Sequence, residues 1–104
     1  MQNMQQMLKQ AKKMQERFDK LQEELGSRTV EAQSGGGMVK VVVTGKQEVI
    51  SIDIEPEVVS AEDKEMLEDL IVAAINEGLR KSQEMFQEEV SKLTGGIKLP
   101  FFNK

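Results

Sequence analysis

The chain has 104 residues, enough for one domain, with a net charge of −4 and 38% apolar residues. It has no cysteine and no histidine, which excludes disulfides, thiolate nucleophiles, cysteine-type zinc sites and the commonest general base of enzymes. No apolar run approaches the roughly 18 residues of a membrane span, and no signal peptide is visible. We therefore expect a cytoplasmic protein with no enzymatic activity, cofactor, membrane partner or small-molecule substrate.

Residues 1–25 form the first predicted helix. Apolar residues recur in it at alternating steps of three and four, the spacing of a heptad seam sustained over three heptads. Gly26 follows directly and is expected to end the helix. At 1.5 Å per residue the helix would be about 37 Å long. The seam consists of Met4, Met7, Ala11, Met14, Phe18, Leu21 and Leu25.

Three short segments of alternating apolar and polar residues predict a sheet over residues 28–56. Turns at residues 34–37 and 45–47 separate them at hairpin spacing, and Pro56 ends the last. We therefore expect a three-stranded antiparallel meander with one buried face. The residues expected to share a face are Val39, Val41 and Val43 in the middle strand and Ile50, Ile52 and Ile54 in the last.

The glycine run Gly35-Gly36-Gly37 raises the question of a phosphate-binding loop. It has neither the GxxxxGK[ST] spacing of a P-loop nor the GxGxxG spacing of a dinucleotide site, and it opens a strand instead of a helix. We interpret it as a hairpin turn that needs residues at positive φ.

Residues 61–93 form the second predicted helix, about 50 Å long. Ser60 and Asp63 have the spacing of a capping box, which predicts a start near Ala61. An apolar stripe continues to Leu93, and Thr94-Gly95-Gly96 closes the helix. Residues 97–104 form a short tail with an exposed Phe101-Phe102 pair.

Both helices are longer than the sheet, which spans only about 25 Å at 3.3 Å per residue. Their overhanging ends still carry apolar stripes, and a second copy of the chain is the simplest cover for them. We therefore expect a homodimer with helical ends projecting from a sheet-containing body. Met4, Met7 and Met14 are most simply core or dimer contacts; a groove for partner helices is the alternative.

The acidic residues of the last strand do not form a recognisable metal site. Asp53 and Glu55 share one face and, with Glu48 or Glu57, could hold a hard cation. Nothing matches a calcium loop or a paired-acid site, however. We interpret these carboxylates as a solvated face and predict no metal site.

A basic arc lies on the first helix, opposite the seam. Like charges four residues apart cost a few tenths of a kcal/mol each, and no acid precedes Glu16 although helix N-termini favour acids. The sequence thus accepts small penalties that keep this end positive. The alternative is an ordinary solvated face in which Lys12 and Lys20 pair with Glu16. The arc covers about 80° and holds Lys9, Lys13, Arg17 and Lys20.

A smaller basic cluster lies on the second helix. It consists of Arg80 and Lys81, and Glu84 is placed to pair with both. Lys92 likewise has Glu88 and Glu89 beside it, so pairing on the helix surface is the simpler interpretation for all three cations.

Four segments together resemble the YbaB/EbfC family of bacterial nucleoid-associated proteins. They are MQNMQQMLKQAKKMQ, GGGMVKVVVTGKQEVISIDIEPEVV, DKEMLEDLIVAAINEGLRKSQE and LTGGIKLP, which cover most of the chain. The resemblance implies an α+β fold (α-β-β-β-α) in a single domain, residues 1–104, and a tweezer-like homodimer. It also implies projecting helices that contact double-stranded DNA with limited sequence specificity, a role in nucleoid organisation and gene regulation, and no catalytic residues.

The resemblance and the basic arc together give the predicted DNA-binding residues. Gly78 stands where we expect alanine, at a cost of about 1 kcal/mol in helix propensity unless a close crossing needs it. We predict a dimeric nucleoid protein that binds the phosphate backbone of DNA. The alternative is a protein-interaction module whose Met-rich helical ends grip a partner, with weak or indirect DNA binding. The predicted DNA-binding residues are Lys9, Lys12, Lys13, Arg17, Lys20, Arg80 and Lys81.

Overall fold

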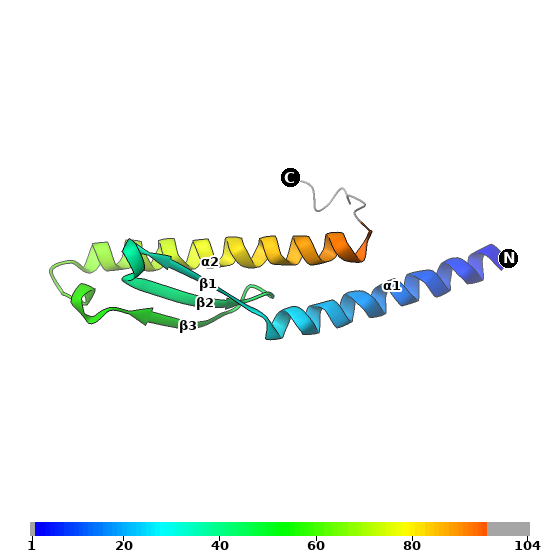
Figure 1. The fold of residues 1–104 in the computed structure, drawn as a ribbon, viewed down its shortest axis with the longest axis horizontal. Coiled ribbons are helices and arrows are strands. Elements are labelled where there is room, and N and C mark those ends of the chain that lie inside the picture. The colour runs from blue at the N-terminus through cyan, green and yellow to red at the C-terminus, as the bar shows by residue number, and fades with distance from the viewer. Residues whose placement is uncertain (1, 96–104) are drawn as a thin grey trace.

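The computed structural model describes residues 2–95, so the predicted tail with Phe101 and Phe102 lies outside the described residues. The elements are helix α1 (Gln2–Ser27), strands β1 (Thr29–Ser34), β2 (Val39–Thr44) and β3 (Val49–Ile54), and helix α2 (Lys64–Leu93). Short 3₁₀ turns occupy Gly35–Gly37 and Pro56–Val58. The order helix, three-stranded meander, helix confirms the predicted α-β-β-β-α fold (Figure 1).

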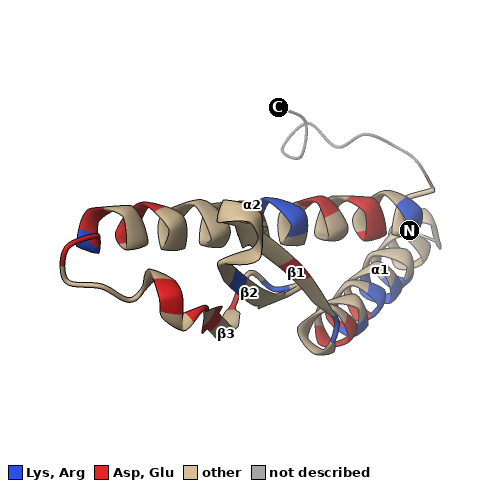
Figure 2. Ribbon diagram, turned by 60° about the vertical axis from the view of Figure 1, so that its left-hand side comes forward, with Lys and Arg blue, Asp and Glu red and all other residues tan. Residues whose placement is uncertain are grey.

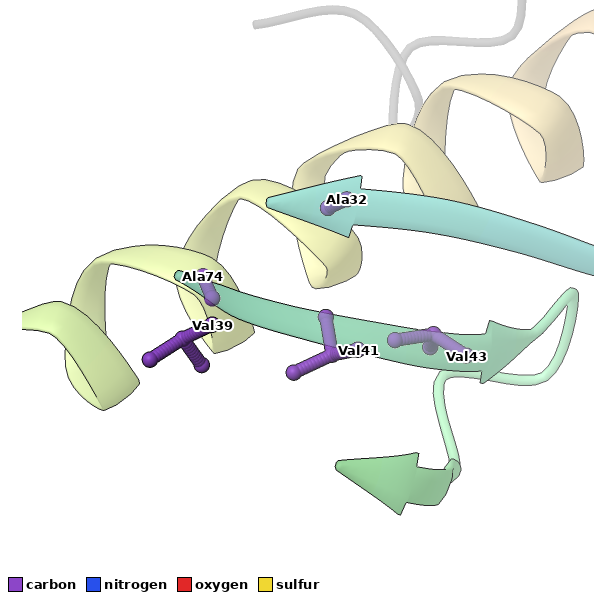
Figure 3. Packing of buried hydrophobic residues seen from close by; sticks show 5 residues of the cluster. All are labelled: Ala32, Val39, Val41, Val43 and Ala74. Carbon is purple, nitrogen blue, oxygen red and sulfur yellow. The ribbon is translucent and has the colours of Figure 1, made fainter. Parts of the chain in front are cut away.

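The sheet is antiparallel in the order β1-β2-β3, and α2 crosses one of its faces. Val39, Val41 and Val43 point from the central strand toward α2 and are completely buried, as predicted (Figure 3). Ala32 of β1 and Ala74 of α2 complete this core. Small side chains at these two positions allow the helix to lie close to the sheet.

The prediction for β3 was wrong in part. Ile54 is half-buried against the core, but Ile52 is 43% exposed and Ile50 is 57% exposed. One reason is that α2 packs over β1 and β2 and leaves β3 uncovered. The other is a bulge that places Val49, instead of Ile50, opposite Val43. The β3 side of the sheet is therefore an exposed apolar surface.

Gly78 occupies the closest approach between α2 and the sheet. A Cβ at this position would lie 2.7 Å from Val43 Cγ2 and 3.1 Å from Val41 Cγ2. The close crossing that would justify a glycine in the helix is therefore present. Glycine also serves its expected role in the first hairpin, where Gly35, Gly36 and Gly37 have φ values of 61°, 68° and 96°. The interpretation of the glycine run as a turn is confirmed.

Ser82 of α2 holds the turn between β2 and β3. Its hydroxyl donates to the Thr44 carbonyl oxygen at 2.7 Å and accepts from the Gln47 amide at 3.1 Å. Gln47 has a positive φ of 65°, and Ser82 is completely buried. One hydroxyl therefore stabilises both a strained turn and its position against α2.

The second helix begins later than predicted. It starts at Lys64, with Asp63 as the N-cap, and no side chain caps the first turn. Ser60 does not form the expected capping box; its hydroxyl accepts from the Glu62 amide at 3.2 Å and closes a local turn. At the other helix, Gly26 does not end α1, which continues through Ser27.

Within residues 2–95, only the C-terminal part of the seam on α1 is buried. Leu21 and Leu25 pack against Met85 and Val90 of α2, and the Phe18 and Phe86 rings meet edge to face at 6.2 Å. Beyond this contact α1 extends past the end of α2 (Figure 1). The radius of gyration is 19.2 Å, against about 13 Å for a compact chain of this length, and the long axis measures 71 Å. The N-terminal part of α1 therefore projects from the body of the molecule, and we refer to residues 2–20 of this helix as the arm.

Candidate nucleic-acid interface

The arm carries five of the predicted site residues. All five are exposed, and within residues 2–95 none of them forms an ion pair. The pairing of Lys12 and Lys20 with Glu16, which would have made this an ordinary solvated face, is not formed. The charges therefore remain available to an external anion. These residues are Lys9, Lys12, Lys13, Arg17 and Lys20.

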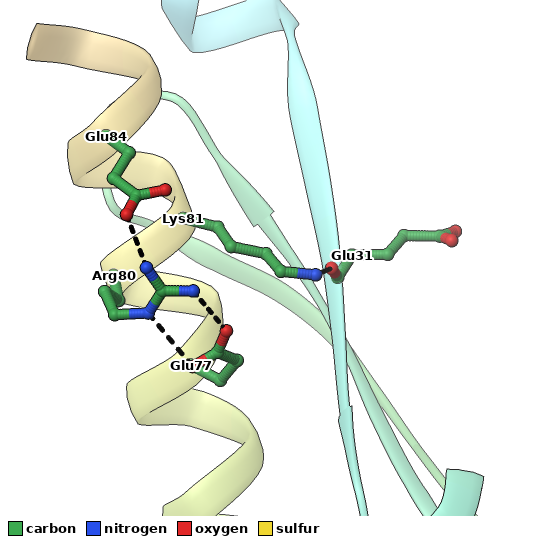
Figure 4. Close-up of polar contacts among 5 residues, drawn as sticks. All are labelled: Glu31, Glu77, Arg80, Lys81 and Glu84. Carbon is green, nitrogen blue, oxygen red and sulfur yellow. Dashed lines mark hydrogen bonds and ion pairs between the residues drawn. The ribbon is translucent and has the colours of Figure 1, made fainter.

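The two predicted cations of α2 have different surroundings. The Arg80 guanidinium lies between two carboxylates, with Glu77 at 2.5 Å and Glu84 on the following turn (Figure 4). The hydrogen bonds with Glu77 raise the pKa of Arg80 and lower the pKa of Glu77. Lys81 donates to the backbone carbonyl of Glu31 on β1 at 2.9 Å. Arg80 and Lys81 are thus engaged within the chain and lie away from the arm.

Lys92 is a cation that the sequence reasoning set aside. It lines a shallow depression between α1 and α2 together with Arg17 and Lys20. Its side chain is 71% exposed, and its ammonium lies 3.3 Å from Glu89, which also binds Arg28 at 3.1 Å. The Glu89 carboxylate is therefore shared by Arg28 and Lys92, and these three side chains together keep a net positive charge. The only sequence signal for this grouping was the apolar seam that brings the two helices together.

Replacing Glu89 with Gln should weaken the junction between α1 and α2 in a pH-dependent way. Hydrogen bonds from Arg28 and Lys92 lower the pKa of Glu89 below its ordinary value of 4.5. Stabilisation by this group is therefore complete above that value and lost as the pH falls through the lower pKa of the folded state. Thermal unfolding should show a lower midpoint for E89Q at pH 7, and the difference should shrink below pH 4.5.

The neighbouring Glu88 supplies the matched control, because it is exposed and forms none of the ion pairs found among the described residues. E88Q should unfold like the parent protein at both pH values. A midpoint difference between E89Q and the parent that does not change with pH would contradict this role for Glu89.

The charges separate along the long axis of the molecule. Residues 9–20 carry five cations and two acids, a net of +3, whereas residues 53–69 carry eight acids and Lys64, a net of −7. The first group lies on the arm and the second at the opposite end, around β3 and the start of α2 (Figure 2). A polyanion would therefore meet attraction at one end of the chain and repulsion at the other.

Two other kinds of site find no support in the described part of the chain. Residues 2–95 contain no group of three or more His, Cys, Asp or Glu side chains arranged to hold a metal ion. Among the same residues, no helix is long and apolar enough to cross a membrane.

Comparison with known proteins gives a consistent result. The model of the YbaB/EbfC DNA-binding family matches residues 1–97. Proteins named nucleoid-associated protein are 58% identical in Desulforamulus reducens (94% of this chain, 93% of the relative) and 57% identical in Moorella thermoacetica (96% of each). The crystal structure of an uncharacterized protein from Helicobacter pylori superimposes with a TM-score of 0.77 at 25% identity, covering 85% of this chain and 92% of that one.

Proposed function

Because the chain belongs to the YbaB/EbfC DNA-binding family, we propose that it is a nucleoid-associated protein that binds double-stranded DNA as a homodimer. The observation that carries this proposal is the set of exposed cations on the arm, which form no ion pair within residues 2–95. We also propose that the protein acts in the cytoplasm, without enzymatic activity, in nucleoid organisation and gene regulation. A mobility-shift titration with duplex DNA tests the proposed DNA binding, and charge reversal on α1 must abolish most of that binding.

The composition of the arm favours contacts with phosphate over contacts with base edges. Four of its five cations are lysines, which act on phosphate as point charges. Residues 2–17 contain no aromatic side chain to insert between bases, and Asn3 is the only asparagine. Phosphate contacts position a protein without reading sequence. The shape and deformability of DNA would therefore set any sequence preference, and specificity would be limited.

Arg80 and Lys81 have a smaller place in this proposal. Arg80 is neutralised by two carboxylates, and Lys81 is held by a carbonyl oxygen of β1. Releasing either cation to bind phosphate would break contacts already made within the chain. Lys92 has a better position, beside Arg17 and Lys20, and we add it to the proposed interface.

The exposed apolar surface between β3 and α2 is the proposed dimer contact. Ile50 and Ile52 are the most exposed apolar residues of β3. Val72 of α2 is 56% exposed and lies nine residues before Lys81, half a turn around the helix. Because Lys81 reaches β1, Val72 lies on the side of α2 that faces β3. A second copy of the chain placed against this surface would bury Ile50, Ile52 and Val72 and cover the open edge of the sheet at β3.

Substitution of Ile52 by Glu should weaken dimerisation. Each dimer would bury two new carboxylates in an apolar contact, and burial of an unpaired charge costs several kcal/mol. We expect dimerisation at least about tenfold weaker for I52E. Sedimentation velocity over a range of protein concentrations measures the change.

Ser51 supplies the control because adjacent strand residues point to opposite faces of the sheet. S51E adds the same charge to the same strand, on the face away from α2, and should stay dimeric. Equal dimerisation of I52E and the parent protein would place the contact between copies elsewhere.

A further inference from the structure

The arm has an apolar side that the described chain leaves uncovered. Met4 is 70% exposed, Met7 is 68% exposed and Met14 is 43% exposed, and all three lie on the side of α1 opposite the cations. Leu8 beside them is 65% exposed. A continuous apolar strip of this kind on a surface marks a place of contact.

The last residues of the chain begin next to this strip. Leu93 at the end of α2 packs against the buried cluster that contains Leu21 and Leu25 of α1, and a turn at Thr94 and Gly95 ends the helix. Residues 96–104 therefore start beside the point where the buried part of the seam gives way to the exposed part. Nine extended residues span about 30 Å, and the distance along α1 from Phe18 to Met4 is about 21 Å. The tail is long enough to follow the strip to its end.

The sequence of the tail suits an extended segment with one apolar face. Ile97, Leu99 and Phe101 alternate with other residues, so an extended backbone presents them together. Pro100 opposes a helix at this place. Aromatic rings make favourable contacts with methionine sulfur, and three methionines line the strip.

We propose that residues 96–104 dock in extended form along Met4, Met7, Ala11 and Met14 of their own chain. The tail is preferred over a second copy because its tether gives a high local concentration. Two arms packed strip to strip would in addition bring two helical ends of +3 together. Docking covers the apolar side of the arm and adds Lys98 and Lys104 to its positive charge.

A spin label near the end of the tail can test this arrangement, because the chain contains no cysteine. N103C in the full-length protein would carry a nitroxide, and ¹³C-methyl methionine would report relaxation enhancement. A docked tail places position 103 near the N-terminal end of the strip. The enhancement should therefore decrease in the order Met4, Met7, Met14. Met66, exposed near the far end of α2, should show none.

An undocked tail gives the opposite order, because its end stays on average close to Gly95 and so to Met14. That order would overturn the proposal. The variant F101A/F102A keeps the tether and removes the anchoring rings, and it should lower the enhancement at Met4 at least threefold. An unchanged value would also overturn it.

Mixed dimers, with spin label and ¹³C on different chains, should show no effect at Met4; an effect there would assign docking to the partner's arm. Buried Met85 reports that the fold is retained.

Discussion

Reversal of three charges on the arm, K9E/K13E/R17E, should lower affinity for duplex DNA at least about 100-fold at 0.1 M salt. If each arm of the dimer neutralises about three phosphates, the parent protein should show a log–log salt slope of about −5. The variant replaces three attractions per arm with three repulsions and should bring the slope close to zero. Mobility-shift titrations at several salt concentrations measure affinity and slope together.

A matched variant separates this local effect from a change in net charge. K40E/K46E/K64E changes the charge of the chain by the same amount, but on the sheet, the second turn and the start of α2. We expect its affinity to fall by less than about tenfold, mainly through long-range repulsion. If the two triple variants bind DNA equally well, the arm is not the DNA-binding surface.

Enlarging Gly78 should destabilise the protein even though alanine and leucine are better helix formers. The Cβ of G78A would meet Val43 Cγ2 at 2.7 Å, and overpacking costs about 1–3 kcal/mol. The gain in helix propensity is only about 1 kcal/mol, so G78A should lose about 1 kcal/mol net. G78L should lose more than about 4 kcal/mol, a large part of the stability of a small domain. Urea unfolding at a fixed protein concentration measures both.

Ala73 on the same helix provides the comparison because it is exposed. A73G should lose about 1 kcal/mol through propensity alone, and A73L should change stability by less than about 0.5 kcal/mol. Greater stability of G78A than of the parent protein would mean that the sheet moves away at little cost. The close crossing would then have no role in selecting glycine.

The order and type of the helices and strands could be predicted from local sequence patterns. Which strand residues are covered by α2 could not. Alternation in β2 was sufficient to place Val39, Val41 and Val43 in the core, because that strand is central. The same pattern in β3 predicted burial of Ile50 and Ile52 incorrectly. Neither the bulge in β3 nor the position of α2 over β1 and β2 produces a recognisable repeat in the sequence. Ser60 does not cap α2, because its hydroxyl accepts a hydrogen bond from the Glu62 amide and closes a local turn instead.

The arm was visible in the sequence because helical periodicity alone separates its cations from its apolar seam. That its cations form no ion pairs with the other described residues could not be predicted, since Lys12 and Glu16 have a spacing that permits pairing. Lys92 was missed because its neighbours along the chain, Glu88 and Glu89, suggested a neutralised site. Its actual neighbours, Arg17 and Lys20, come from an element more than 70 residues earlier.

The separation of charge along a 71 Å axis gives each chain a large electric dipole moment. In the field of a DNA duplex such a dipole experiences a torque that turns the arm toward the phosphates before any contact forms. The torque acts over roughly one Debye length, about 10 Å at 0.1 M salt. If the arm binds DNA as proposed, the acids around β3 would therefore affect the kinetics of encounter without contacting DNA: they would raise the fraction of collisions that begin arm first.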